Sequence, residues 1–266
     1  MNFRNIYMKK VLIIGYGDIG YRVAARLPKQ EFTGISRSAS ADLLNVEFIQ
    51  QDWISEPQLI LPSGDFSTIV MVLKPTSSDT EGYQQGFLDT SHQMMNFFNN
   101  HTSYEKLLIV SSTRVYGLGN GRNITEAVKP LPDDQQARII LEYEEFVARE
   151  SKIEPLILRP SGLYDEQAHW MKNHIDTFNG KKYPLRFAEA NMFSRTNLAL
   201  VIANYICNKE SAHISGPLIC SEQARKYSEI FSLVCPDYSF EDFFIGSDKI
   251  GKSFDPQKLL DSGLMR

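Results

Sequence analysis

The sequence predicts an α/β fold, a doubly wound parallel sheet that carries a small additional lobe at its C-terminal end. Two patterns support this prediction. Short apolar runs alternate with helical segments along the first 160 residues, and the first run, 11–14, leads directly into a glycine-rich turn. The chain has 266 residues, of which 42% are hydrophobic, enough to build one large domain or two small ones.

The expected strands are apolar runs that are too short for helices and are bounded by turn residues. After 11–14 they fall near 32–36, 46–50, 68–73, 107–110 and 156–158, with a later one at 217–220. Between them, helical spacing and capping residues predict helices over 18–27, 81–100, from Asp133 or Asp134 to 151, 196–207 and 222–233. We therefore expect a dinucleotide-binding domain over 1–160. Residues 161–266 would form a second lobe, some elements of which return to the sheet.

The most specific motif lies between the first strand and the first helix. Its first glycine allows a tight turn, its second lets backbone approach a pyrophosphate, and its third lets helix and strand pack closely. Backbone N–H groups at the helix start would then meet the phosphates. The alternative is a glycine turn in an unrelated α/β protein. The predicted dinucleotide site, of Rossmann type, contains Gly15, Tyr16, Gly17, Asp18, Ile19 and Gly20.

Composition narrows the partners and the location. A net charge of −4 without a long basic run argues against nucleic acid, and no apolar run approaches the length of a membrane span. The apolar run after the basic start is interrupted by Asp18, too early for a signal peptide. The cysteines are odd in number and form no CxxC pair. We expect a cytoplasmic protein with a small-molecule substrate, and the sequence leaves its oligomeric state open.

The residues after the second strand bear on the choice of cofactor. NAD enzymes place an acidic residue about 20 positions beyond the glycines to bind the ribose 2′-hydroxyl. Here that strand ends in Ser36, Arg37 and Ser38, with no acid at its tip. A guanidinium pairs well with a 2′-phosphate, and the two hydroxyls can add donors. The sequence therefore favours NADP over NAD, unless Arg37 is only a solvated loop charge.

Three motifs taken together give the chain a likeness to a known family. They are the glycine motif, the segment Ser111-Ser112-Thr113-Arg114-Val115-Tyr116-Gly117, and the segment Leu158-Arg159-Pro160-Ser161-Gly162-Leu163-Tyr164. Over about 9–260 the chain resembles the NAD(P)-dependent epimerase/dehydratase group, the extended short-chain dehydrogenases/reductases. The resemblance implies NAD(P)-dependent chemistry on a sugar-like or small carbonyl or hydroxyl substrate. It also implies that Asp52 contacts the adenine amine, although Asp52 could equally be a helix cap before Trp53.

The resemblance fails at the catalytic residues. The family uses a Ser or Thr after the fifth strand, which Ser112 matches, and a YxxxK pair on the next helix. Here Gln136 and Ile140 stand where the tyrosine and lysine belong. Glutamine has no ionisable proton near neutral pH and isoleucine carries no charge, so this pair cannot transfer protons. The one YxxxK in the chain begins at Tyr205, on a later helix, where we expect it to pack in the core.

Other side chains could supply the missing chemistry. Lys74 follows the fourth strand and is expected to face the crevice, contacting the cofactor or acting as a base, unless it is a solvated loop lysine. Tyr116 and Tyr143 are proton-donor candidates, although packing is the commoner role. His169 and His174 are five residues apart, a poor spacing for metal ligands, so no metal is expected.

Two functions stay open. One is an oxidoreductase or epimerase with remodelled catalysis, in which Ser112 hydrogen-bonds the substrate and the segment 164–183 covers it. The other is a non-catalytic protein that senses NADP(H) or uses it structurally. The loss of the YxxxK pair favours the second function, and the retained Ser112 favours the first.

Overall fold

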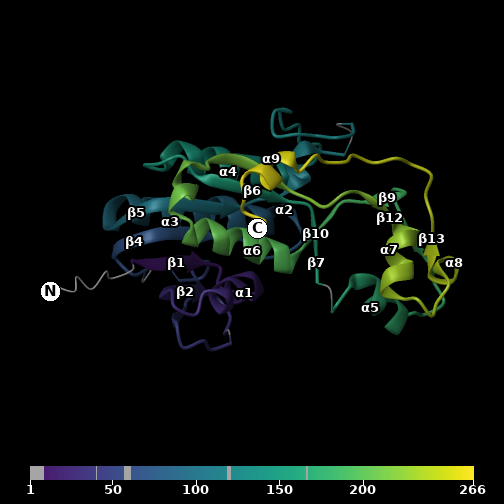
Figure 1. Cartoon of the computed structure of the whole chain (residues 1–266), viewed down its shortest axis with the longest axis horizontal. Helices are drawn as coiled ribbons and strands as arrows, with labels where there is room; N and C mark the ends of the chain where they lie inside the picture. Colours follow the sequence, from purple (N-terminus) through teal and green to yellow (C-terminus); the bar gives the residue numbers. More distant parts are fainter. Residues whose placement is uncertain (1–8, 40, 57–60, 119–120, 166) are drawn as a thin grey trace.

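The centre of the molecule is a seven-stranded parallel sheet in the order β11-β6-β5-β4-β1-β2-β3 (Figure 1). The structure is a computed structural model that describes residues 9–39, 41–56, 61–118, 121–165 and 167–266. The strands are β1 (Lys10–Ile14), β2 (Phe32–Ser36), β3 (Val46–Gln50), β4 (Gly64–Met71), β5 (Thr102–Val110), β6 (Leu156–Pro160) and β11 (Gly216–Cys220). The doubly wound α/β prediction is therefore confirmed.

Side chains of β1 alternate between two hydrophobic cores, one on each face of the sheet. Val11 and Ile13 point into one core, and Leu12 and Ile14 point into the other. All four are fully buried, as expected for a central strand covered by helices on both sides. Strand order reverses between β1 and β4, and at such a switch point the carboxyl ends of the strands open a crevice for ligands.

Helices cover both faces. The face that contains Val11 packs against α1 (Asp18–Arg26) and α6 (Arg195–Cys207), and α9 (Gln257–Asp261) also contributes to this core. The opposite face packs against α3 (Thr90–His101) and α4 (Gln135–Glu150). A short helix α2 (Thr80–Tyr83) and a π-helical turn η1 (Gln84–Asp89) lead into α3, and a 3₁₀ turn η2 (Thr113–Tyr116) follows β5. Another, η3 (Lys209–His213), follows α6.

A smaller lobe lies at one end of the molecule, at the right of Figure 1. It has its own aromatic-rich core, which includes Phe231 and Phe244. Its helices are α5 (Trp170–Asp176), α7 (Tyr227–Val234) and α8 (Phe240–Phe243). Its short strands pair as β7 (Gly162–Tyr164) with β10 (Met192–Ser194), β9 (Glu189–Ala190) with β12 (Arg225–Lys226), and β8 (Tyr183–Pro184) with β13 (Phe244–Ile245).

The main differences from the sequence prediction lie at element boundaries. The helix expected over 81–100 is broken by the π turn η1, and the helix expected over 222–233 begins only at Tyr227. Tertiary contacts explain the later start. The Glu222 carboxylate accepts hydrogen bonds from the Tyr164 hydroxyl and the Ser194 N–H, and residues 225–226 pair with β9. No helix within the described ranges is long and apolar enough to cross a membrane.

Candidate functional site

The glycine turn between β1 and α1 has a conformation that requires its first glycine. Gly15 has φ +82°, and a Cβ added there would lie 2.1 Å from the carbonyl oxygen of Val72. The Gly15 and Tyr16 N–H groups both donate to the carbonyl of Ile35, at 2.9 and 2.8 Å. These contacts fix the turn against the ends of β2 and β4, and α1 begins at Asp18, directly after Gly17.

The second glycine differs from the first. A Cβ on Gly17 would meet nothing closer than the carbonyl oxygen of Gly15 at 4.0 Å, so a side chain would project into open space. That space belongs to a cavity at the carboxyl ends of the strands. The residues therefore fit the backbone approach of a dinucleotide pyrophosphate.

Tyr16 and Gly20, both predicted to belong to the cofactor site, make packing contacts in this structure. The Tyr16 ring is fully buried, and neither residue lines the cavity. A Cβ on Gly20 would lie 2.9 Å from the Tyr16 ring, and one on Gly34 in β2 would lie 2.6 Å from it. These glycines let α1 and β2 close over the ring. Only the backbone of Tyr16 remains available to a ligand at this turn.

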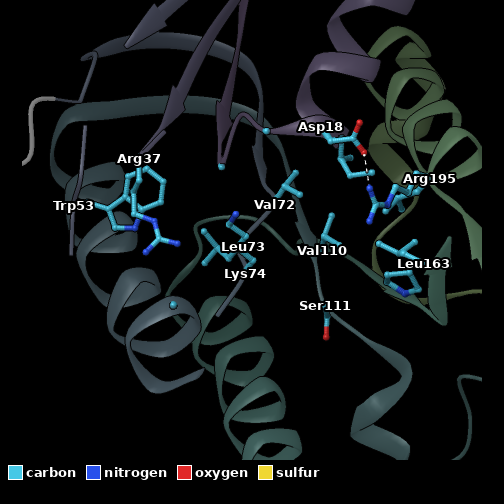
Figure 2. Close-up of a pocket in the computed structure, with 16 residues that line it drawn as sticks. Asp18, Arg37, Trp53, Val72, Leu73, Lys74, Val110, Ser111, Leu163 and Arg195 are labelled. Carbon is cyan, nitrogen blue, oxygen red and sulfur yellow. Dashed lines mark hydrogen bonds and ion pairs between the residues drawn. The ribbon is translucent and has the colours of Figure 1, made fainter. Parts of the chain in front are cut away.

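The cavity has a volume of about 420 Å³ and extends across the switch point from the end of β2 to the ends of β5 and β6 (Figure 2). Its lining is mostly apolar, with a few charged and hydroxyl side chains, the combination that small-molecule sites show. The lining residues are Gly15, Gly17, Asp18, Ile19, Arg37, Trp53, Val72, Leu73, Lys74, Gly86, Val110, Ser111, Pro160, Leu163, Arg195 and Leu198.

One end of the cavity is formed by Arg37 and Trp53. The Arg37 guanidinium carbon lies 5.9 Å from the centroid of the Trp53 ring, within the range of a cation–π contact. The ring is held by a hydrogen bond from its Nε1 to Thr90 Oγ1, 3.2 Å long. The sequence prediction missed Trp53 as a lining residue, although its position just beyond the carboxyl end of β3 is a usable signal.

The other residues predicted near Arg37 do not line the cavity. Ser36 Oγ accepts the N–H of Ser38 at 3.4 Å, and Ser38 is exposed. The Asp52 carboxylate accepts hydrogen bonds from Ser55 Oγ at 2.8 Å and from the Ile54 N–H at 3.2 Å. These bonds, led by that from Ser55, lower the pKa of Asp52. In this structure Asp52 acts as a turn cap.

Charged groups also surround the glycine turn. Arg195, the first residue of α6, points into the cavity, and its Nη1 lies 3.5 Å from Asp18 Oδ2 (Figure 2). Asp18 also pairs with Arg22 at 2.8 Å, and Arg22 contacts Asp165 at the start of the outer lobe. No local sequence signal pointed to Arg195, because α6 reaches the turn only through the tertiary fold.

Ser112 lies next to the cavity but not in its wall. Its half-buried side chain caps η2, with Oγ accepting the Arg114 N–H at 3.1 Å. The neighbouring Ser111 does line the cavity. Ser111 Oγ donates to the carboxylate of Glu144, which pairs with Arg159 at 2.6 Å in the core.

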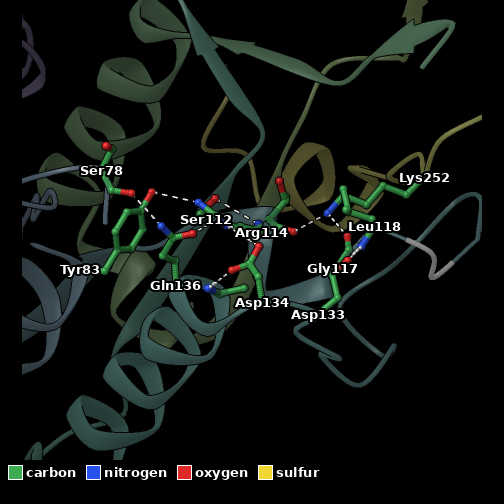
Figure 3. Close-up of polar contacts among 12 residues, drawn as sticks. Ser78, Tyr83, Ser112, Arg114, Gly117, Leu118, Asp133, Asp134, Gln136 and Lys252 are labelled. Carbon is green, nitrogen blue, oxygen red and sulfur yellow. Dashed lines mark hydrogen bonds and ion pairs between the residues drawn. The ribbon is translucent and has the colours of Figure 1, made fainter. Parts of the chain in front are cut away.

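Gln136 and Ile140 are both held in contacts within the protein, and Figure 3 shows those of Gln136. Gln136 Oε1 accepts from Arg114 Nη2 at 2.5 Å, and Gln136 Nε2 donates to the carbonyl of Ser78 at 2.7 Å. Arg114 also pairs with Asp134 at 2.9 Å. Ile140 is 2% exposed and packs in the core. The Arg114 guanidinium therefore links Gln136 and Asp134 in one hydrogen-bonded network.

The alternative proton donors differ in accessibility. Tyr116 and Tyr143 are fully buried, and burial raises the pKa of each, so both hydroxyls stay protonated at neutral pH. Lys74 is exposed and lines the cavity, as expected from the end of β4. Tyr205 of the YxxxK sequence is 2% exposed within the core, and burial raises its pKa to about 12.

His169 and His174 lie in the outer lobe, and neither lines the cavity. His169 Nδ1 accepts the Met171 N–H at 3.3 Å and caps α5, and His174 Nε2 lies 3.2 Å from the Phe243 carbonyl. Within the part of the chain that the structure describes, no group of three His, Cys, Asp or Glu side chains could hold a metal ion. Among the described residues of the segment 164–183, none lines the cavity.

The fold is similar to several solved structures. A candidate NAD-dependent epimerase/dehydratase from Methylobacillus flagellatus is 22% identical, with a TM-score of 0.72, and the match covers 96% of this chain and 92% of that chain. UDP-glucuronic acid 4-epimerase from Bacillus cereus, in complex with UDP-glucuronic acid and NAD, is 13% identical, with a TM-score of 0.74 and the same coverage.

A third similar structure is UDP-N-acetylglucosamine 4-epimerase from Methanobrevibacter ruminantium, in complex with UDP-N-acetylmuramic acid. It is 17% identical, with a TM-score of 0.73, and the match covers 96% of this chain and 91% of that chain. No family model and no curated protein sequence matches the chain. At these identities the likeness establishes a shared architecture, and the fold expected from the resemblance is confirmed.

Proposed function

We propose that this protein binds NADP(H) in the cavity beside the glycine turn and is an oxidoreductase or epimerase with remodelled catalytic residues. The observation that carries the proposal is the glycine turn itself, which opens into a cavity at the switch point of the sheet. Two of the structurally similar proteins act on UDP-sugars by name, which supports a sugar-like or small carbonyl or hydroxyl substrate. A bound nicotinamide would supply hydride transfer.

The preference for NADP rests on Arg37. Its guanidinium lies at the end of β2 beside the Trp53 ring, where an adenine and a 2′-phosphate would be held together. The similar structure from Bacillus cereus contains NAD, so NAD is the alternative cofactor. Comparison of NADPH and NADH affinities by fluorescence titration separates the two. Equal affinities would overturn the NADP preference.

For the chemistry we propose that Ser112 hydrogen-bonds the reacting oxygen of the substrate. Its Oγ accepts a backbone N–H, so its own hydroxyl hydrogen is left to donate. The two residues at the family's acid and lysine positions on α4 cannot supply the proton, because Gln136 and Ile140 do not titrate. The proton would come from another side chain or from water, and Lys74 is the exposed candidate in the cavity wall.

A turnover screen tests this proposal. NADPH oxidation is followed by absorbance against a panel of carbonyl and sugar compounds. On any active substrate Ser112→Ala should lower kcat about 10²-fold or more, as removal of an oxyanion donor does elsewhere. Ser232→Ala, an exposed serine on α7, is the matched control. Full activity in Ser112→Ala would remove Ser112 from the mechanism.

The second candidate function is a non-catalytic NADP(H) sensor. It is favoured by the contacts of Gln136 with Arg114 and Ser78, which hold the family's acid position in a structural network. A sensor would bind NADPH with no turnover on any compound of the panel.

A further inference from the structure

A second cavity lies on the other side of the chain that connects β6 to β7. It has a volume of about 180 Å³, and its polar wall includes Thr113, Ser161, Glu189, Asn191 and Lys252. Pro160 and Leu163 line the cofactor cavity, whereas Ser161 and Gly162, between them in sequence, line this one. We call it the Lys252 cavity.

The Lys252 ammonium group is the main charge in this wall. Nζ donates to the carbonyl oxygens of Thr113, at 3.0 Å, and Gly117 (Figure 3). An ammonium has three hydrogens, so these two bonds leave one for a further acceptor. Burial lowers the pKa of Lys252 to about 8, so the ammonium still dominates at neutral pH.

Three oxygens in the same wall have no hydrogen-bond partner among the described residues, and one of them, Glu189 Oε2, is held instead by an ion pair with Arg122. Ser161 is 6% exposed, and its Oγ is buried and unpaired. Asn191 Nδ2 donates to the Lys252 carbonyl at 2.8 Å, but Asn191 Oδ1 is buried and unpaired. Leaving such groups unsatisfied costs about 1–3 kcal/mol each, so their positions indicate a ligand that supplies the missing bonds.

The remaining charges leave Lys252 as the group that a ligand would neutralise. Glu189 is already paired with Arg122 at 2.9 Å. Tyr227 also lines the cavity, and burial raises its pKa, so its phenol is neutral. Beyond the wall, Asp133 and Asp134 favour the charged amine and Arg114 disfavours it.

We propose that the Lys252 cavity binds a small anion that carries hydroxyl groups, of the class of sugar acids and sugar phosphates. The anionic oxygen would accept from Lys252 Nζ, a ligand hydroxyl would donate to Asn191 Oδ1, and Ser161 Oγ could donate or accept. A charge-assisted bond of this kind is stronger than a neutral one. That this anion is the substrate rests on the proposed function, whereas its binding in the cavity does not.

The test uses calorimetric titration of the full chain with D-gluconate, D-glucose 6-phosphate and neutral sorbitol. We expect at least one anion to bind more than tenfold tighter than sorbitol, and the stronger of the two identifies the carboxylate or the phosphate as the source of charge. Lys252→Met should abolish this difference. Lys249→Met, an exposed lysine on the same segment, should keep it.

The pH profile of the unmodified protein gives an independent readout that needs no variant. The ammonium form binds the anion, so the affinity for gluconate, whose carboxylate stays ionised, should be level from neutral pH to pH 8 and fall by about tenfold per pH unit above it, while sorbitol shows no such fall. Anions that bind no better than sorbitol, or whose affinity ignores pH, would overturn the proposal. NADPH titration of the same sample is scored separately, so a failed cofactor site and a failed anion site are distinguishable.

Discussion

Gly15 and Gly17 are two residues apart, but the absence of a side chain has a different role at each position. At Gly15 the missing side chain is required by the fold, because the positive φ and the Val72 carbonyl leave no room for a Cβ. At Gly17 the protein itself leaves room, so the missing side chain matters only to a ligand. Substitutions at these two positions therefore separate folding from binding.

Gly17→Val should abolish NADPH binding and leave the melting temperature of the free protein within a few degrees. A Cβ at this position would meet nothing closer than the Gly15 carbonyl oxygen at 4.0 Å, so the side chain would enter the space proposed for the pyrophosphate. Calorimetry measures the affinity and circular dichroism the stability. Gly15→Val is the contrasting variant, and it should lower stability strongly. Unchanged NADPH affinity in Gly17→Val would show that the dinucleotide site is elsewhere.

Arg37→Ala should remove most of the preference for NADPH over NADH. Loss of a charge-assisted contact to a phosphate costs about 1.5–3 kcal/mol, roughly tenfold or more in affinity. NADH affinity should change much less, since NADH has no 2′-phosphate. Arg26→Ala, an exposed arginine at the end of α1, is the control. If both variants kept the same NADPH-to-NADH ratio as the parent, Arg37 would not read the phosphate.

Residue-level prediction succeeded where the signal was local. The glycine turn, Arg37 and Lys74 all line the cavity, because each follows a strand end that is visible in the sequence. Trp53 and Arg195 were missed. Trp53 follows β3 and could have been found by the same rule, whereas Arg195 reaches the site only because α6 packs beside α1. Spacing along the chain carries no information about such a contact.

At the scale of elements, an ion pair in the core joins α4 to β6. Glu144 and Arg159 have side chains 2% and 6% exposed, and Arg159 also donates to the Tyr116 hydroxyl at 2.8 Å. Ser111 at the end of β5 donates to the same carboxylate. Contacts of α4, β6 and the end of β5 therefore depend on one buried carboxylate.

Glu144→Gln should lower the free energy of unfolding by about 3–5 kcal/mol, because it leaves a buried arginine without its counter-charge. The amide keeps the shape of the carboxylate, so the loss comes from charge and hydrogen bonding rather than from a cavity. Urea denaturation measures it. Glu150→Gln, at the exposed end of the same helix, should change stability by less than about 1 kcal/mol. Similar small losses in both variants would contradict a structural role for the pair.

Element types were predicted better than their limits. The parallel strands and the Asp134-capped helix α4 follow from apolar runs and a side-chain cap, both local signals. The π turn η1 has no such local signal in the sequence. The late start of α7 depends on contacts with distant segments, such as those of Glu222 with Tyr164 and Ser194. The strands of the outer lobe are also not visible as local sequence signals, because each is only two or three residues long.

At the scale of the whole molecule, the two halves of the sequence do not correspond to two separate bodies. The helix α6 and the strand β11 come from beyond residue 160 and complete the central sheet and one of its faces. The cavity at the switch point of the sheet is also lined by Leu163, Arg195 and Leu198 from the second half. Elements on both sides of the expected boundary at residue 160 therefore share one sheet and one hydrophobic core, as expected for those elements of 161–266 that return to the sheet.

A fragment of residues 1–160 should consequently fail to fold alone and fail to bind NADPH. Without α6, the buried side chains of β1 and α1, such as Val11 and Val23, would lose the cover given by Val201 and Ile202 and face water. An apolar patch of this kind is an aggregation liability. The fragment should be insoluble or bind a hydrophobic dye without a cooperative thermal transition, whereas the full chain melts cooperatively and is stabilised by NADPH. A soluble, cooperatively melting fragment with full NADPH affinity would show that the first 160 residues are a self-sufficient domain, and that α6 and β11 only decorate it.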